Sequence, residues 1–242
     1  MINFDILQNF DLLSVGMAIA AIGILGFVVY FNNHRSVTSR SFLWFAVVTI
    51  FWSAANYLQY KTTDPTTSFW MLRLVVFFGM WYAFSIFRLF TVFPEEKFDF
   101  PKSYTRLLLP VISIVSILSL TPLVFESISE IDFSGHLVGV NNGPAIVLYA
   151  FMVLGLIIAS FYNLFKKTIM ARGQERRGFL YLLFGVLVTF ILMLVFNFIL
   201  PAFFGIIDYI PLGPVFVLPF AVFTFYAISR HNLFAVKVIS TE

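Results

Sequence analysis

The sequence contains no cysteine. Disulfide bonds, thiolate metal sites and cysteine nucleophiles are therefore excluded. Charge is also scarce, because only 11% of the 242 residues are Asp, Glu, Lys or Arg, whereas a soluble domain has about 25%. With 60% hydrophobic and 19% aromatic residues, the composition predicts a membrane protein.

Ionisable residues are also missing from the centres of the apolar runs. His34, His136 and His231 fall in connections or at the end of a run, which argues against a haem held by two intramembrane histidines. No run has a central His or Asp for an intramembrane protease, or the midplane carboxylate typical of ion-coupled transport. The last run has no lysine that could hold retinal. We therefore predict no catalytic residue, cofactor, metal site or nucleic-acid partner.

Seven apolar runs remain when the sequence is divided at its charges and turn residues. Each is near or above the roughly 20 residues that a membrane-spanning helix needs. They cover residues 12–31, 41–60, 68–93, 107–125, 144–165, 179–204 and 210–229. The connections are too short to bury a core of their own. We predict one transmembrane domain, residues 1–229, followed by a juxtamembrane signalling segment, residues 230–242.

The basic residues predict how this domain is oriented. Thirteen of the 15 lysines and arginines follow the first, third, fifth and seventh runs or lie at their ends. Only Lys61 and Arg73 remain for the other side, where most of the carboxylates lie. Because cytoplasmic loops retain positive charge, the sequence predicts an all-α membrane protein. It would be a seven-transmembrane helix bundle with the N-terminus outside and the C-terminus in the cytoplasm.

Polar side chains gather in the outer third of the predicted bundle. On the second run they recur at the spacing of one helical face, and the others lie near the outer ends of later runs. The candidate ligand-binding residues are Asn56, Tyr57, Tyr60, Trp70, Arg73, Tyr149, Asn197 and Asp208. In a closed bundle they would line a cup open to the outside.

This predicted cup has two interpretations. In the structural one, Arg73 pairs with Asp208 or with a carboxylate of a loop, and the amides and hydroxyls satisfy one another between helices. In the functional one, an aromatic-rich pocket with one cation binds a small ligand that is anionic or amphipathic, including a lipid. The two interpretations are compatible.

Two local patterns predict departures from regular helix, one in a connection between runs and one in the last run. Apolar positions alternate on both sides of Ser134 and Gly135, which indicates a short hairpin over the bundle, either a lid or a connector. In the last run, Pro214 and Pro219 indicate kinks and a hinge between them.

Several short motifs resemble those of a known family. They are Trp52 and Tyr57, Trp70 and Arg73, Phe93-Pro94, ARGQERRGFLYLLFG at 171–185, Gly213-Pro214 and YAISRHNLF at 226–234. In this order and spacing, over nearly all of the chain, they resemble the N-terminal seven-transmembrane sensor region of bacterial histidine kinases.

The resemblance implies a receptor of the bacterial plasma (inner) membrane whose last helix continues into a dimerising helix and a kinase. Its partners would be the lipid bilayer, a cytoplasmic signalling domain and a ligand, with a second copy of the chain as a further candidate. The sequence ends at Glu242 without a phosphoacceptor helix or an ATP-binding domain, so we expect no kinase activity from this chain alone.

Two other classes of function stay open. In a small-molecule transporter or channel, the cup would be one end of a path, and uptake into liposomes would reveal it. In a membrane subunit that only docks a partner, side chains would fill the cup and leave no cavity.

Overall fold

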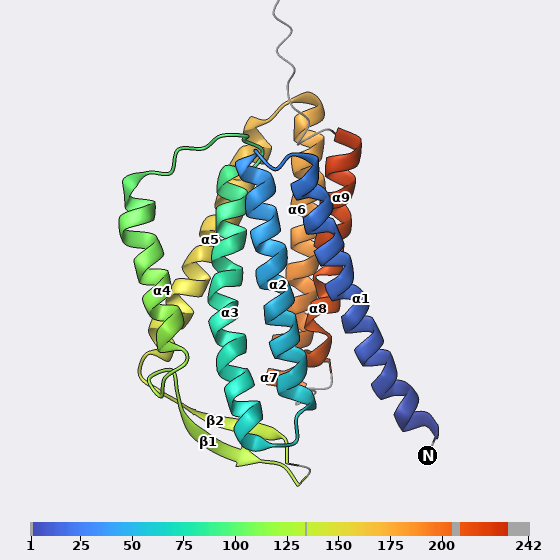
Figure 1. Cartoon of the computed structure of the whole chain (residues 1–242), viewed down its shortest axis with the longest axis vertical. Helices are drawn as coiled ribbons and strands as arrows, with labels where there is room; N and C mark the ends of the chain where they lie inside the picture. Colours follow the sequence, from blue (N-terminus) through green and yellow to red (C-terminus); the bar gives the residue numbers. More distant parts are fainter. Residues whose placement is uncertain (1, 134, 205–208, 232–242) are drawn as a thin grey trace, which may run out of the picture.

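Long helices make up most of the computed structural model, which describes residues 2–133, 135–204 and 209–231 (Figure 1). The helices and strands, in chain order, are α1 (Ile2–Asn32), α2 (Val37–Lys61), α3 (Pro65–Val92), the π-helical turn η1 (Tyr104–Leu108), α4 (Leu109–Leu118), β1 (Phe125–Ile131), β2 (Leu137–Asn142), α5 (Ile146–Met170), α6 (Gly173–Leu194), the π-helical turn η2 (Val195–Ile199), α7 (Leu200–Phe204), the 3-10 turn η3 (Ile210–Leu212), α8 (Gly213–Phe216) and α9 (Leu218–His231). The predicted all-α class is confirmed, with one hairpin added.

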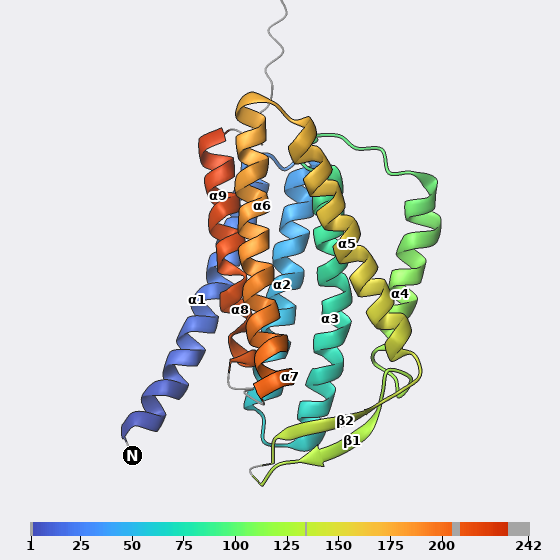
Figure 2. The ribbon, with the colours of Figure 1, turned by 180° about the vertical axis from the view of Figure 1, so that it is seen from behind.

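Five of these helices are long and apolar enough to cross a membrane. Their apolar parts are Phe10–Asn32, Val37–Lys61, Pro65–Val92, Ile146–Met170 and Arg176–Asn197. Two further apolar helices, Tyr104–Leu118 and Ile210–Thr224, are shorter. Figures 1 and 2 show that these two also run alongside the long helices. Length and composition thus support five of the seven predicted spans directly.

The fourth predicted run extends too far at its C-terminal end. Its helix ends at Leu118, and Phe125 already belongs to β1. Between them the chain turns, with the N–H of Thr121 bonded to the carbonyl of Leu118 at 3.0 Å. Pro122 follows, and a proline has no N–H with which to continue a helix. The apolar residues of this turn therefore connect the helix to the hairpin.

The seventh predicted run is broken where its prolines indicated. α8 ends at Phe216, and the N–H of Val217 bonds to the carbonyl of Pro214 at 3.2 Å. Pro219 follows in the first turn of α9, where a missing N–H costs little. The predicted kink between the two prolines is confirmed as a helix break.

The predicted hairpin is also confirmed. β1 and β2 pair antiparallel, with register shifts along the ladder. Near its turn, Gly135 has a φ of +91°, and a Cβ added there would lie 2.5 Å from the carbonyl oxygen of Thr63. Only glycine fits this conformation and this contact without strain. The hairpin therefore lies against the loop between α2 and α3 and runs beneath α3 at that end of the bundle (Figure 1).

Buried apolar side chains form two cores. The main core joins α1, α2, α3, α5, α6 and α9 and includes Phe42, Phe45, Phe90 and Phe220. The side core joins α3, α4 and α5, and Met80, Phe84, Ile112 and Leu156 are buried in it. Many large apolar side chains on the outer surface are exposed, including Phe151 at 74%. Such a surface suits contact with lipid.

The two ends of the bundle differ. α1 begins at the end where the hairpin lies, which we call the hairpin end, and α9 ends at the opposite end (Figures 1 and 2). That opposite end carries the loop 93–103 and the α5–α6 turn. It also carries most of the lysines and arginines, so we call it the basic end. This separation agrees with the sequence pattern from which the orientation is predicted.

Candidate functional site

The start of α3 is fixed at the hairpin end by its cap. The Asp64 carboxylate accepts hydrogen bonds from the N–H and the hydroxyl of Thr67, at 2.8 and 2.5 Å. These bonds lower the pKa of Asp64 below its ordinary value, the hydroxyl contributing most. The hydroxyl of Ser68 donates to the carbonyl of Gln59 on α2 at 2.9 Å. The next turns of α3, including Arg73, are thereby held in place.

Arg73 is a buried cation beneath the hairpin. Its side chain is 7% exposed, and its Nη2 donates to the carbonyl oxygen of Phe125 on β1 at 2.9 Å. The guanidinium carbon lies 4.4 Å from the ring centre of Phe69 and 5.0 Å from that of Trp70. Ring faces attract a cation. The Nε atom is buried and has no hydrogen-bond partner among the described residues.

Tyr149 meets α3 one helical turn further along. Its hydroxyl donates to the carbonyl of Val76 at 2.8 Å. Gly79 makes this approach possible, because a Cβ added there would lie 2.9 Å from the Tyr149 hydroxyl. Trp70, Arg73 and the Tyr149 bond at Val76 lie on successive turns of α3, and the bonds of Arg73 and Tyr149 join α3 to β1 and α5; we call these three residues the Arg73 group.

Asn56 and Asn197 form a second group beside the broken seventh run. Asn56 donates from Nδ2 to the carbonyl of Ile210 at 3.1 Å. A Cβ added at Gly213 would lie 3.5 Å from Nδ2 of each asparagine and 3.3 Å from the ring of Trp52. The asparagines therefore converge on Gly213, whose missing side chain leaves them room; we call this the Asn56 group.

The Asn56 group has unused hydrogen-bonding capacity. Asn197 lies in η2 and donates to the sulfur of Met193 at 3.3 Å, but its Oδ1 is buried without a described partner. The hydroxyl of Ser53, one turn before Asn56, is also buried without one. Such groups commonly bond to ordered water or to a ligand.

The remaining predicted residues lie apart from these contacts. Tyr57 is half-buried, and the ammonium of Lys61 lies 5.8 Å from its ring centre. Lys61 also forms an ion pair with Asp11 at 3.3 Å, joining α1 to α2. Tyr60 is half-buried in the last turn of α2. Asp208 lies outside the described residues.

The contacts therefore divide the predicted cup into two groups instead of one. In the structural interpretation Arg73 pairs with Asp208 or with a carboxylate of a loop. Asp208 lies outside the described residues, and the side chains of residues 2–9 and 174–175 are not described either. Among the carboxylates whose side chains the structure describes, none lies within 4 Å of Arg73, whose hydrogen bond goes to a main-chain carbonyl. Across the part of the chain that the structure describes, no group of three or more His, Asp and Glu residues is arranged to hold a metal ion.

A polar network at the basic end was missed in the sequence. Lys167 on α5 donates to the carbonyl of Thr91 at 2.7 Å and to that of Phe93, and Asn163 donates to the hydroxyl of Thr91 at 2.9 Å. These bonds satisfy carbonyls at the end of α3 that have no partner within the helix. In the sequence Lys167 is one of two consecutive lysines after an apolar run, and nothing distinguishes it from Lys166.

Apolar helices, exposed apolar surfaces and polar groups buried between helices define a multi-pass helical membrane protein. The family described as the N-terminal 7TM region of histidine kinase matches residues 14–237. The chain belongs to this family. Comparisons with curated proteins and with solved structures give no match. Membership implies a membrane sensor domain of a two-component system, and the matched region is the sensor part of such kinases, distinct from their catalytic part.

Proposed function

We propose that this domain detects a small anionic or amphipathic ligand at the hairpin end and passes the signal to a cytoplasmic signalling domain through α9. In this proposal the chain crosses the bacterial inner membrane seven times, with the N-terminus outside. Arg73, Trp70 and Tyr149 would contact the ligand, and the separate Asn56 group would be a second candidate contact region. Tyr57, Tyr60 and Asp208 remain candidate contacts in the same proposal.

The observation that carries this proposal is the state of the Arg73 guanidinium. It is buried, its described partners are one carbonyl and two rings, and its Nε is unused. Among the described side chains no carboxylate lies beside it, and a buried cation without one is costly. An anionic group entering beneath the hairpin would reduce this cost and would compete for the bond to Phe125.

Contacts along α3 supply a route from Arg73 to the other end. Near the end of α3, the ring of Phe90 lies 6.2 Å from that of Phe220 on α9, and Phe93 lies 5.1 Å from Phe179 on α6. A shift or rotation of α3 would therefore change the packing of both helices. α9 ends at the basic end, from which a signalling domain would be reached.

Such a switch requires that the ligand prefer one arrangement of the bundle. Moving a two-state equilibrium from 1:99 to 99:1 takes a difference of about 5.5 kcal/mol in binding free energy. A charge-assisted hydrogen bond contributes about 1.5–3 kcal/mol. One such bond is too weak to move the equilibrium alone. If Arg73 exchanges its bond to Phe125 for a bond to the ligand, other contacts must also differ between the two states.

The proposal is tested by fusing the chain, after Glu242, to the cytoplasmic part of a histidine kinase with a reporter gene. We expect Arg73→Leu to change the basal output, because the hairpin loses its bond to α3, and Arg73→Lys to change it less. Hydrogen exchange at the β1 amides should rise roughly tenfold in Arg73→Leu. Arg106→Leu, which removes an exposed arginine at the basic end, is the control.

Membrane levels of the variants are measured by immunoblotting. Equal basal output from all four proteins, at equal levels, would contradict a sensory role for Arg73. Release of a trapped solute from liposomes that contain the purified chain would instead favour a transporter or channel.

A further inference from the structure

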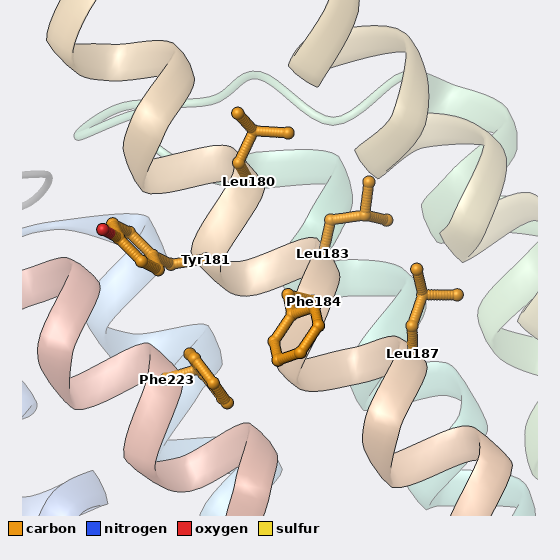
Figure 3. A pocket seen from close by; sticks show the side chains of 6 residues that line it. All are labelled: Leu180, Tyr181, Leu183, Phe184, Leu187 and Phe223. Atoms are coloured by element: carbon orange, nitrogen blue, oxygen red, sulfur yellow. The ribbon is translucent and has the colours of Figure 1, made fainter.

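An apolar groove of about 440 Å³ lies between α6 and α9, away from both polar groups (Figure 3). Its lining residues are Leu180, Tyr181, Leu183, Phe184, Leu187 and Phe223. Phe223 comes from α9 and the others from α6. Leu180 and Phe184 are 46% and 54% exposed, so the groove opens on the outer surface of the bundle, where lipid would lie.

Close contact between α6 and α9 forms the floor of the groove. A Cβ added at Gly185 would lie 2.8 Å from Cβ of Phe223 and 3.3 Å from Cα of Phe220. On the groove side, the rings of Phe184 and Phe223 meet edge to face at 5.0 Å (Figure 3). Well-packed rings of this kind give the groove fixed apolar walls.

Positive charge lies at one end of the groove. Arg176 and Arg177 are exposed in the first turns of α6, at the basic end. Leu180 follows them by four and three residues, the spacing of neighbours on one helical face. Phe184 lies seven residues after Arg177, which is about 10 Å along the helix. A charged group followed by an apolar slot therefore lies along one side of α6.

We propose that this groove binds an anionic phospholipid from the membrane leaflet at the basic end. Its phosphate lies at Arg176 and Arg177, and one acyl chain lies in the groove. Arginine binds phosphate through two parallel N–H···O bonds. An apolar helix of a second copy could cover the groove, but an apolar surface supplies no anion for the two arginines. This inference does not depend on a ligand at Arg73.

The role of the two arginines in lipid binding is tested with the purified full chain in detergent. The protein is incubated with phosphatidylglycerol or phosphatidylcholine, and the bound lipid is measured by native mass spectrometry. The wild type should retain more phosphatidylglycerol than phosphatidylcholine. We expect the double variant Arg176→Gln/Arg177→Gln to bind phosphatidylglycerol roughly tenfold more weakly. The control, Arg106→Gln/Lys166→Gln, removes two exposed basic residues elsewhere at the same end and should bind like the wild type.

The acyl-chain position is tested by filling the groove with Leu187→Trp. This variant keeps both arginines and should also lose phosphatidylglycerol. Leu154→Trp introduces the same side chain at an exposed position of α5 outside the groove and should have no effect. The circular dichroism and thermal midpoint of each variant show whether it is folded.

Each of four results would overturn the proposal. They are equal retention of both lipids by the wild type, equal loss in the two double variants, unchanged binding by folded Leu187→Trp, and a dimer that the Leu187→Trp substitution disrupts while lipid binding persists.

Discussion

Arg73 and Tyr149 each donate a hydrogen bond to a main-chain carbonyl on a different element, at 2.9 and 2.8 Å. A carbonyl is a weaker partner for a cation than a carboxylate is, because it has no net charge. The carbonyl of Phe125 therefore holds Arg73 in place without neutralising it. At the residue scale, and among the side chains that the structure describes, the guanidinium at the hairpin end has a fixed position and no carboxylate beside it.

Asp64 allows a pH test of the local structure at this end. Its lowered pKa means that the ionised carboxylate is favoured in the folded protein. The stabilisation is therefore present above the pKa of the unfolded chain, about 4, and is lost as the pH falls through the folded value. We expect Asp64→Ala to lower the thermal midpoint by a few degrees at neutral pH, and the difference from the wild type to shrink in acid.

The measurement is the thermal midpoint of both proteins in detergent between neutral and acid pH. Asp99→Ala is the control, since Asp99 is exposed in the loop 93–103. A difference that stays constant across this range would show that the carboxylate charge is not what caps α3.

At the element scale, the sequence predicted what depends on local patterns. Alternating apolar residues predicted the hairpin, and Pro214 and Pro219 predicted the break between α8 and α9. The third run was predicted to begin at residue 68, three residues late, because Asp64 and Pro65 begin α3. The predicted C-terminal end of the fourth run was wrong, because the hydropathy of residues 119–125 does not distinguish an apolar turn from a helix. Periodicity alone cannot indicate that Lys167 bonds to the end of α3, because that contact depends on how α5 packs against it.

The same limit applies to the candidate site. We predicted one cup that contains both Arg73 and Asn56 because the two residues lie at a similar depth in the membrane, each near the same end of its helix. The structure assigns their contacts to different neighbours, the hairpin for Arg73 and η3 for Asn56. Which face of a helix meets which neighbour depends on helix rotation, and a seven-run hydropathy pattern contains little information about that.

Gly185 and Gly155 give a matched test of the packing between α6 and α9. An added Cβ meets Phe223 at 2.8 Å at Gly185, but nothing within 4 Å at Gly155 on α5. We expect Gly185→Ala to destabilise the protein by about 1–3 kcal/mol, because α9 must move. Gly155→Ala should be neutral or stabilising, since alanine favours helices.

Unfolding of the two glycine variants is followed by circular dichroism in mixed detergent with increasing denaturant. Equal stability of both variants would show that the close contact at Gly185 relaxes without cost.

Lys167 and Lys166 provide a second matched pair, at the basic end. Lys167 is half-buried and bonds to the carbonyls of Thr91 and Phe93, whereas Lys166 is exposed. We expect Lys167→Met to lower the free energy of unfolding by about 2 kcal/mol, because these carbonyls lose a charged donor. Lys166→Met should change it little. A stability loss of the same size in both variants would indicate a general effect of charge.

At the scale of the whole molecule, the path of the chain places the hairpin and the loop 93–103 at opposite ends of the bundle (Figures 1 and 2). Glu130 is exposed on β1 and Lys102 is exposed beside that loop's end. If the basic end faces the cytoplasm, as its lysines and arginines predict, these positions lie on different sides of the membrane. The sensor proposal requires that arrangement, because a ligand from outside must reach Arg73 beneath the hairpin.

The absence of cysteine makes this orientation directly measurable, since a single introduced thiol is the only one in the chain. In intact cells, a membrane-impermeant maleimide should label Glu130→Cys and leave Lys102→Cys unlabelled. After the membrane is permeabilised both should react, and the unsubstituted chain should react in neither condition. The reverse pattern would place the hairpin in the cytoplasm, so that Arg73 would meet only intracellular ligands. Labelling of both positions in intact cells would show that the basic end does not face the cytoplasm. Transmission to a cytoplasmic domain through α9 would then be excluded.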